Sequence, residues 1–440
     1  MTRRGLTQGG RPRVLVLAEA ANPEMVSVPL VGWSLTSALR EVADVHLVTQ
    51  IRNRDAILRA GWSEGRDFTA IDSEAVARPL WRLSQMLGVG GSTNRGWTVQ
   101  QAITVFSDAY FDRLAWRLFG PEVQAGGWDI VHRVTPLSPV KPSFFGRQAA
   151  RAGVPFVMGP LNGGVPWPAG YAESRAREGE RLSILRGAVR LLPGRTATWR
   201  AACAIMAGSR HTAGEIAEVA AQKVIYLPEN GIDPTRFTAR ATSGSRGLPL
   251  RAVFVGRMVP YKMPDALVEA AAPLMAEGKL VLDLIGEGPL LGEIRALADK
   301  LGVSDRLTLH GSVPHGEVGK IMAGCDVLAF PSIREFGGGV VIEAMAIGLP
   351  PLVVDYAGPG EIVQPEWGLK VPIGPRDAVV AGFRATLERL VADPAQLGPL
   401  GEAARARAEE MFAWSRKAAQ VRQVYDWVLG QRSSRPAPFG

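Results

Sequence analysis

Two acidic side chains flank three consecutive glycines in the second half of the chain. Glu335 precedes Gly337–Gly339, Glu343 follows them, and seven residues separate the two glutamates. Consecutive glycines leave backbone N–H groups unshielded, and at a helix start such groups bind anions. A carboxylate one turn into that helix, as Glu343 would be, can accept hydrogen bonds from ribose hydroxyls. The alternative is a helix N-terminus whose acids only suit the helix dipole, but three glycines are costly where nothing binds.

Two cationic side chains follow an apolar run earlier in the same half. The run Ala252–Val255 is typical of a buried strand, Arg257 comes two residues later, and Lys262 lies five residues further on. In open α/β sheets, ligands bind beyond the carboxyl ends of the strands. A guanidinium fork and a mobile ammonium on one such loop suit a diphosphate. The alternative is an ordinary solvated loop.

The first half offers three candidate positions at predicted strand ends. His132 ends the run Asp129–Val131, and we expect it to point towards a cleft, although a lone histidine is more often structural. Gly32 would let a backbone approach closely below a helix start. The segment 159–164, which contains Asn162 and Gly163, follows another apolar run and is too rich in glycine for packing alone.

Several other chemistries lack their motifs. There is no Asp-x-Asp metal clamp, no Walker P-loop, no His-Glu-x-x-His and no Gly-x-Ser-x-Gly elbow. Gly286 and Gly288 lack the third glycine of a dinucleotide-binding fingerprint. Cys203 and Cys325 lie far apart and match no paired-ligand spacing, so neither a disulfide framework nor a zinc site is expected.

The elements that must position these residues alternate between strands and helices along all 440 residues. This alternation predicts an α/β protein of two doubly wound, Rossmann-like domains facing a cleft. We expect an N-terminal domain at 1–225, a C-terminal domain at 226–412, and a C-terminal helix within 413–440 that packs back on the N-terminal domain. The best linker candidate is 238–247. The predicted strands are the short, apolar runs 14–17, 45–49, 129–132, 155–158, 203–206, 224–227, 252–255, 280–285, 307–309, 327–330 and 352–354.

Charge and tryptophan are unevenly distributed between the two halves. Residues 1–240 carry 29 Lys and Arg against 20 Asp and Glu, and residues 241–440 carry 21 against 22. Eight of the 11 tryptophans lie in the first part. A basic surface favours anionic partners, so the asymmetry indicates two modules with different partners.

Arginine interleaved with apolar residues suggests contact between the N-terminal domain and an anionic lipid surface. The segments are 78–83, 111–119 and 181–200, and the alternative is arginine stems that snorkel from ordinary helices. No apolar stretch approaches the roughly 18 residues needed to span a bilayer, and residues 1–10 lack the apolar region of a secretory signal. We therefore expect a cytoplasmic protein, peripheral on the inner face of the plasma membrane if the lipid contact is real.

The second half resembles family-four retaining glycosyltransferases of the GT-B fold. The resemblance covers nearly all of the C-terminal domain as an ordered set of motifs, and the first half is similar more loosely. One departure is Glu335-Phe336-Gly337-Gly338, where many members read Glu-Gly-Phe-Gly, and another is Val31-Gly32 in place of the usual Gly-Gly. The motifs are Val255-Gly256-Arg257 with Lys262, Gly286-Glu287-Gly288-Pro289-Leu290, Gly311-Ser312-Val313, Asp326, Pro331-Ser332, and Glu335 with Glu343.

The resemblance assigns roles to individual residues. It implies that Arg257 and Lys262 hold the donor diphosphate and that Glu343 binds the nucleotide ribose. Gly338, Gly339 and Val340 would give amides to the phosphates, the backbone near Val313 would face the base, and Gly32 would contribute a further donor contact. Glu335 would contact the transferred sugar, His132 would lie beside the sugar and acceptor as the second catalytic residue, and Asn162 and Gly163 would lie on the acceptor side.

The implied activity is transfer of a sugar from a UDP-type or GDP-type nucleotide sugar to a hydroxyl of a saccharide or lipid-linked acceptor, in polysaccharide or glycolipid biosynthesis. Retention of configuration is implied, and no cofactor or metal is expected because cationic side chains replace the metal. Two alternatives stay open: a nucleotide-sugar epimerase of the same fold, and a basic nucleic-acid-binding protein. The intact set of diphosphate-binding and ribose-binding residues in the neutral C-terminal domain argues against the latter, so no nucleic-acid partner is expected.

Overall fold

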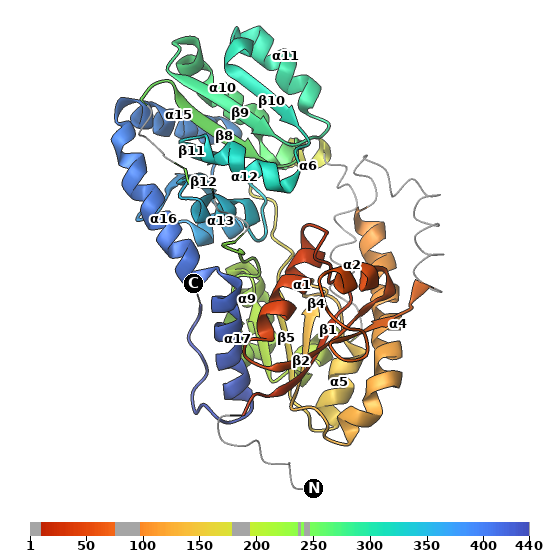
Figure 1. The fold of residues 1–440 in the computed structure, drawn as a ribbon. Helices are drawn as coiled ribbons and strands as arrows, with labels where there is room; N and C mark the ends of the chain where they lie inside the picture. The colour runs from red at the N-terminus through yellow and green to blue at the C-terminus, as the bar shows by residue number, and fades with distance from the viewer. Residues whose placement is uncertain (1–9, 75–96, 178–193, 236–238, 242–246, 440) are drawn as a thin grey trace. The chain divides into compact units, whose positions relative to one another are not determined.

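Short apolar runs form parallel strands in the computed structural model, which describes all residues except 1–9, 75–96, 178–193, 236–238, 242–246 and 440 (Figure 1). For residues 97–106 and His315 the structure describes the backbone and not the side chains. The chain divides into two compact units. Unit 1 comprises Met1–Gly164, Gly179–Glu229 and Trp414–Gly440, and unit 2 comprises Val165–Glu178 and Asn230–Ala413.

Unit 1 is built on a seven-stranded parallel sheet in the order β3-β2-β1-β4-β5-β6-β7. Its central strands are apolar on both faces, as expected of a sheet covered by helices on both sides. The strands are β1 (Arg13–Ala18), β2 (Asp44–Gln50), β3 (Phe68–Ile71), β4 (Ile130–Thr135), β5 (Phe156–Leu161), β6 (Ala204–Ala207) and β7 (Val224–Tyr226). The helices are α1 (Val28–Leu39), α2 (Arg54–Arg59), α4 (Trp97–Gln124), α5 (Phe144–Arg151), α8 (Arg195–Ala201), α9 (Arg210–Ala220) and α17 (Trp414–Val428), with 3₁₀ turns η1 (Ile51–Asn53) and η3 (Ala221–Lys223).

The final helix of the chain completes the core of unit 1. Apolar side chains of α17, including Val421 and Val424, pack with those of α1 over the sheet, and the dark-blue helix lies beside that sheet in Figure 1. Tyr425 is fully buried in the same cluster. Since a fully buried large apolar side chain contributes about 1.5–3 kcal/mol, α17 is an integral part of this unit.

Unit 2 is built on a six-stranded parallel sheet in the order β10-β9-β8-β11-β12-β13. The strands are β8 (Leu250–Val255), β9 (Leu280–Ile285), β10 (Leu307–Gly311), β11 (Val327–Phe330), β12 (Pro351–Asp355) and β13 (Leu369–Pro372). The helices are α6 (Ala172–Arg177), α10 (Pro264–Ala276), α11 (Leu291–Leu301), α12 (His315–Ala323), α13 (Gly339–Ala346), α14 (Ala357–Ile362), α15 (Arg376–Ala392) and α16 (Leu397–Met411), with 3₁₀ turns η4 (Pro260–Lys262), η5 (Ser304–Arg306) and η6 (Pro394–Gln396).

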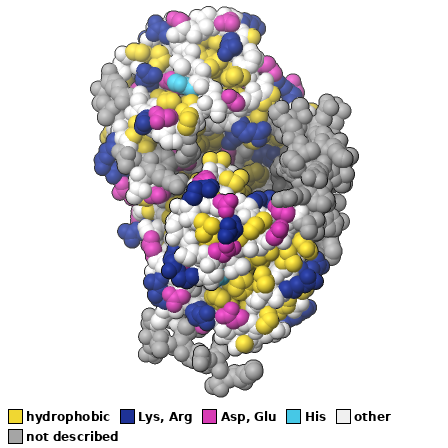
Figure 2. Space-filling model, turned by 45° about the vertical axis from the view of Figure 1, so that its right-hand side comes forward, with side chains coloured by type: hydrophobic (Ala, Val, Ile, Leu, Met, Phe, Trp, Pro, Cys, Tyr) yellow, Lys and Arg dark blue, Asp and Glu magenta, His cyan; other side chains and the backbone are white. Residues whose placement is uncertain are grey.

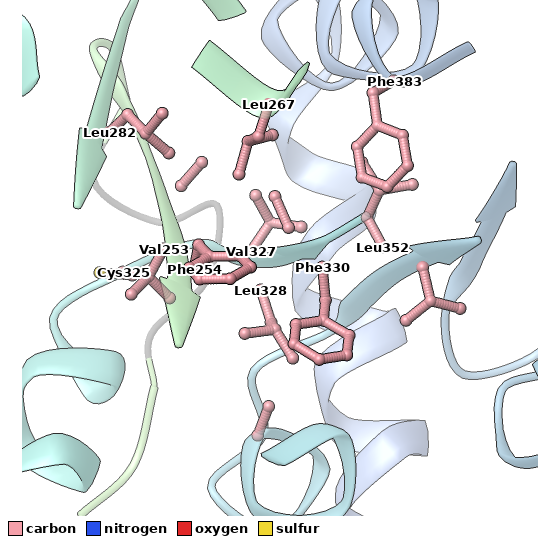
Figure 3. Packing of buried hydrophobic residues seen from close by; sticks show 14 of the residues in the cluster. Val253, Phe254, Leu267, Leu282, Cys325, Val327, Leu328, Phe330, Leu352 and Phe383 are labelled. Atoms are coloured by element: carbon pink, nitrogen blue, oxygen red, sulfur yellow. The ribbon is translucent and has the colours of Figure 1, made fainter. Parts of the chain in front are cut away.

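The core of unit 2 forms around its two central strands. Phe254 of β8 and Phe330 of β11 stack with their ring centroids 5.8 Å apart. Figure 3 shows these rings among Leu267 of α10, Leu352 of β12 and Phe383 of α15. This packing fixes the carboxyl ends of β8 and β11, from which the loops carrying the candidate donor residues begin.

Some features differ from the expectations drawn from the sequence. The edge strands β3 and β13 were not predicted, because Phe68–Ile71 and Leu369–Pro372 are short and include polar residues or proline. The segment Val165–Glu178 belongs to unit 2 rather than to the N-terminal domain. The candidate linker 238–247 lies largely outside the described residues, as do segment 78–83 and most of the arginine-rich segment 181–200. Every helix in the described part of the chain is too short or too polar to cross a lipid bilayer.

Candidate active site

Three loops at the carboxyl ends of β8, β9 and β10 are joined by backbone hydrogen bonds. The amide of Gly256 donates to Ile285 O at 2.9 Å, and that of Gly286 donates to Gly311 O at 2.8 Å. A Cβ at Gly286, whose φ is +131°, would lie 2.0 Å from the carbonyl oxygen of Gly256. The Gly286-Glu287-Gly288 motif therefore serves close packing between loops, which positions the backbone around Arg257.

Lys262 ends the 3₁₀ turn η4, and its ammonium turns towards the loop that follows β11. Met263, with φ of 53°, redirects the chain into α10 directly after it. The Lys262 ammonium forms an ion pair with the Glu335 carboxylate and lies 4.8 Å from the centroid of the Phe330 ring. Only 12% of the Lys262 side chain is exposed. The structure thus brings together the two residues predicted for the diphosphate and the transferred sugar.

Burial and a neighbouring cation act on the charge of Lys262. Removal of the ammonium from water, together with repulsion from the guanidinium of Arg257, lowers the pKa of Lys262 to about 7. Arg257 itself is exposed. An incoming dianion would relieve the repulsion between the two cations and favour the charged form of Lys262, so this corner of unit 2 is suited to a diphosphate.

The loop carrying Glu335 is fastened to its neighbours through the backbone. The amide of Ile333 donates to Tyr261 O at 3.0 Å, and the amide of Gly358 donates to Glu335 O at 3.2 Å. The Glu335 side chain is 21% exposed. These two hydrogen bonds therefore fix the backbone of the loop at Glu335, while the Glu335 carboxylate remains accessible at the surface.

The glycine run forms the N-terminus of α13, as predicted. Gly338 caps the helix with φ of 57°, a conformation that favours glycine, and a Cβ there would lie 3.0 Å from Ile362 Cδ1. The first amides of a helix, here those of Gly339 and Val340, have no partner within the helix. These N–H groups and the helix dipole make this end favourable for phosphate.

The remaining predicted donor residues lie in the same unit. Glu343 is half-buried one turn into α13, and Val313 is half-buried after β10, packed against the core. Arg334 was given no role from sequence, yet it is buried beside Glu335, with its guanidinium 5.3 Å from the Trp167 ring and 5.6 Å from the Phe336 ring. Arg334 therefore supports the conformation of this loop. Its position directly before Glu335 was the only feature of the sequence that could have indicated this role.

The expectation that His132 lies at the reaction centre is wrong for the described structure. The side chain is fully buried in unit 1, with Nε2 2.8 Å from Gly159 O and Nδ1 2.7 Å from the Tyr425 hydroxyl. A carbonyl only accepts, so Nε2 carries the proton and Nδ1 accepts from Tyr425. Burial lowers the pKa of His132 to about 4. With both nitrogens engaged, this neutral histidine joins the sheet to α17.

The three other positions predicted in unit 1 also have structural partners. Gly32 lies inside α1 rather than in a loop, and a Cβ there would lie 2.1 Å from Ala20 O, so packing explains the glycine. Nδ2 of Asn162 lies 2.7 Å from both carboxylate oxygens of Glu229, and its Oδ1 accepts from the amide of Gly163 at 2.8 Å. The Gly163 carbonyl accepts from Thr212 Oγ1 at 3.1 Å. Asn162 and Gly163 thus connect the end of β5 to Glu229, the last residue of the segment Gly179–Glu229 of unit 1.

A groove of about 580 Å³ lies at the opposite, amino ends of the unit 1 strands. Its rim includes Arg13 and Arg40, whose guanidinium groups pair with Glu122 and Asp67 at 3.4 and 3.3 Å. Because these cations are already neutralised, and the groove is remote from the carboxyl ends of the strands, we assign no chemistry to it.

Comparisons with known proteins agree with the geometry of unit 2. Residues 235–406 match the family model described as glycosyl transferases group 1. A 2-deoxystreptamine glucosyltransferase of Streptomyces kanamyceticus is 30% identical over 48% of this chain and 57% of its own length. A D-inositol 3-phosphate glycosyltransferase of Streptomyces bingchenggensis is 32% identical over 46% of this chain and 48% of its own. The chain thus spans about half the length of the curated relatives it matches.

Solved structures resemble the described fold over most of the chain. A glycosyltransferase from Rickettsia africae ESF-5 has a TM-score of 0.62 at 13% identity, covering 96% of this chain and 100% of that one. Anabaena Alr3699/HepE in complex with UDP and glucose has a TM-score of 0.58 at 16% identity over the same shares. The predicted fold class, α/β with two parallel Rossmann-like sheets of the GT-B type, is confirmed.

Proposed function

We propose that this chain is a retaining glycosyltransferase that uses a nucleoside diphosphate sugar, because residues 235–406 match the glycosyl transferases group 1 family model. The observation that carries the proposal is the arrangement in unit 2 of Lys262, Glu335 and the N-terminus of α13 at the carboxyl ends of β8 and β11. The Anabaena structure holds UDP and glucose, and the curated relatives bear glycosyltransferase names. UDP is therefore the first nucleotide to test, ahead of GDP.

In the proposed reaction, the diphosphate takes the place of Glu335 as the partner of Lys262. Arg257, Lys262 and the first amides of α13 then stabilise the negative charge that develops on the leaving phosphate, which is the role that a metal plays in other enzymes. Metal independence is accordingly part of the proposal. Glu343 binds the ribose of the same nucleotide.

Retention is proposed to follow a same-face substitution. The bond from the anomeric carbon to the phosphate oxygen breaks, the acceptor oxygen bonds to that carbon from the same side, and the departing phosphate takes the acceptor proton. Glu335, released from Lys262, accepts hydrogen bonds from hydroxyls of the transferred sugar. A covalent intermediate on Glu335 is the alternative, by analogy with retaining hydrolases.

Calorimetric titration with UDP, GDP and ADP, without added metal, tests the donor site. We expect micromolar binding of one nucleotide and a loss of about 10–100-fold in Lys262→Ala, since a hydrogen bond to a charged group contributes about 1.5–3 kcal/mol. Lys320→Ala, an exposed lysine of α12, is the matched control and should bind as the natural chain does. No binding of any of the three nucleotides would contradict the donor assignment.

A second variant separates binding from transfer. Glu335→Gln should bind the nucleotide at least as tightly as the natural chain, because the carboxylate no longer competes for Lys262, but should lose transfer at least 100-fold. Chromatography of the products also distinguishes the two candidate enzymes. A glycosyltransferase yields a glycosylated acceptor, whereas a nucleotide-sugar epimerase of the same fold yields an epimerised nucleotide sugar.

Peripheral association with an anionic membrane is also proposed, on one surface feature of unit 1. Arg113 and Arg117 are exposed four residues apart on α4, next to Leu118, whose exposed fraction is 60%. Figure 2 shows hydrophobic side chains gathered on one flank of this unit, with Lys and Arg nearby. Co-sedimentation with phosphatidylglycerol vesicles should fall in Arg113→Ala/Arg117→Ala, and equal sedimentation would refute the association.

A further inference from the structure

A segment between two strands of unit 1 packs on unit 2 instead. We call residues 165–177 the strap. It follows Gly164 of unit 1 and includes α6, the yellow helix beside the green and cyan elements of unit 2 in Figure 1. The helix packs against η4, the turn that ends at Lys262. The strap therefore reaches a loop of the proposed donor site from a distant part of the sequence.

Two prolines flank Trp167 and stiffen the start of the strap. A proline fixes its own φ and keeps the residue before it extended, so the backbone of this stretch has little freedom. Two side chains of unit 2 fasten it further. Arg334 Nε donates to Val165 O at 3.4 Å, and the Tyr356 hydroxyl donates to Pro166 O at 3.0 Å. The indole of Trp167 thus projects from a fixed backbone.

The Trp167 ring contacts the residues that directly precede both charged partners of the proposed donor site. Its centroid lies 6.3 Å from that of the Tyr261 ring, at an interplanar angle of 88°. The Arg334 guanidinium lies 5.3 Å from the Trp167 ring. Tyr261 precedes Lys262, and Arg334 precedes Glu335. One indole therefore packs against both of the loops that the Lys262–Glu335 ion pair joins.

The same contact affects the surroundings of the Lys262 ammonium. The ammonium lies 5.8 Å from the centroid of the Tyr261 ring, so Tyr261 contacts both Trp167 and Lys262. Burial is the main reason that the pKa of Lys262 is lowered to about 7. A Tyr261 ring that is no longer packed by Trp167 would admit water to the ammonium, and the pKa of Lys262 would then rise.

We infer that Trp167 is a positioning residue for the proposed donor site and holds Lys262 and Glu335 in place through the residues before them. The inference rests on the proposed function and adds to it a residue from the N-terminal half of the sequence. The strap has a separate anchor in Tyr171, which is 3% exposed in the core of unit 2. Trp167 therefore acts on the two loops, while Tyr171 attaches the strap.

Titration of the full chain with UDP is the first test. Trp167→Ala should weaken UDP binding about tenfold, because binding groups lose affinity when they are misplaced. Trp167→Phe keeps an aromatic ring beside Arg334 and should stay within about twofold of the natural chain. Arg177→Ala removes an exposed ion pair between the same strap and Glu293, and as the matched control it should change nothing.

Competitive acetylation of lysines, measured by mass spectrometry on the full chain without nucleotide, is the second test. The midpoint of the Lys262 pH profile should move upward in Trp167→Ala and stay in place in Trp167→Phe. A loss of packing elsewhere in unit 2 would leave this midpoint unchanged. Tyr356→Phe removes only the hydroxyl bound to Pro166 O. It is the second variant if Trp167→Ala does not fold, and both readouts should move in the same directions by smaller amounts.

The two tests separate this inference from the proposed function. UDP binding by the natural chain, with neither readout changed in Trp167→Ala, refutes the inference alone. Equal losses in Trp167→Ala and Trp167→Phe, or in Trp167→Ala and Arg177→Ala, would also overturn it. If the natural chain does not bind UDP but the Lys262 midpoint still moves in Trp167→Ala, the proposed donor function fails and the contact from Trp167 to Lys262 stands.

Discussion

Lys262 shows how one buried cation can respond to its ligand. Its ammonium is held among Glu335, the Phe330 ring and the field of Arg257, and burial with that field lowers its pKa to about 7. A bound diphosphate adds negative charge and favours the ammonium, so the pKa of Lys262 must rise in the complex. Binding and protonation are therefore coupled in a defined direction.

This coupling predicts proton uptake on nucleotide binding. The pKa of Lys262 is lowered to about 7, so above that pH part of the free protein carries the neutral amine, and nucleotide binding should take up protons. Affinity for the nucleotide should therefore fall as the pH rises above about 7. Calorimetry of UDP binding in HEPES and in Tris measures the uptake. Lys262→Arg stays charged and should lose this pH dependence, and equal heats in both buffers for the natural chain would contradict the coupling.

The loops of the proposed donor site in unit 2 are held together by close approach of their backbones. Gly286 lies where the loop after β9 crosses the loop after β8, and its amide also binds the end of β10. One glycine therefore connects three strand ends. The close contact at Gly286 therefore determines how precisely the residues proposed to hold the diphosphate are positioned.

The crossing predicts contrasting effects of two glycine substitutions. Gly286→Ala places a Cβ 2.0 Å from Gly256 O at a φ of +131°, and should cost about 2–4 kcal/mol of unfolding free energy and weaken UDP binding. Gly292→Ala lies in the first turn of α11 with no atom within 4 Å of the added Cβ, and should be neutral or stabilising by up to about 1 kcal/mol. Urea unfolding and UDP titration measure both variants, and equal stabilities would refute the account.

At the scale of the whole molecule, the described residues of each unit form their own hydrophobic core, and that of unit 1 consists of two clusters. The unit 1 core includes α17 and the buried pair His132–Tyr425, whereas the unit 2 core surrounds Phe254 and Phe330 and supports the donor loops. Each core belongs to its own parallel sheet. We therefore expect two unfolding transitions, each sensitive to its own residues and ligands.

Scanning calorimetry of the full chain checks this expectation. UDP at about 100 times its Kd should stabilise only the unit 2 transition, by about 2.7 kcal/mol. Tyr425→Phe leaves His132 Nδ1 without its donor and should destabilise only the unit 1 transition, by about 1–3 kcal/mol. A single transition that moves with both changes would show that the two cores unfold as one.

The pH dependence of the unit 1 transition has a definite sign. The pKa of His132 is lowered to about 4 in the folded state, below the usual value of about 6.5. Between these values the unfolded chain binds more protons, so stability is lost as pH falls from about 6.5 towards 4. The loss approaches roughly 3 kcal/mol for this one buried group.

The sequence alone determined the α/β class, the central strands and most of the residues of the proposed donor site in unit 2. Arg257, Lys262, Glu335, the glycine run and Glu343 each lie within a few residues of a strand end, and parallel strands bring their carboxyl ends to one edge. Local pattern therefore sufficed to predict which residues meet there. The edge strands β3 and β13 escaped prediction because a strand bordered on one side only needs fewer apolar residues.

Only the tertiary structure decided what the candidate residues of unit 1 do. His132 is paired with Tyr425, 293 positions along the chain, and Asn162 with Glu229, 67 positions away. A side chain at a strand end can face the ligand edge or the helices that cover the sheet. That choice depends on which distant segment packs there, and no local spacing in the sequence records it.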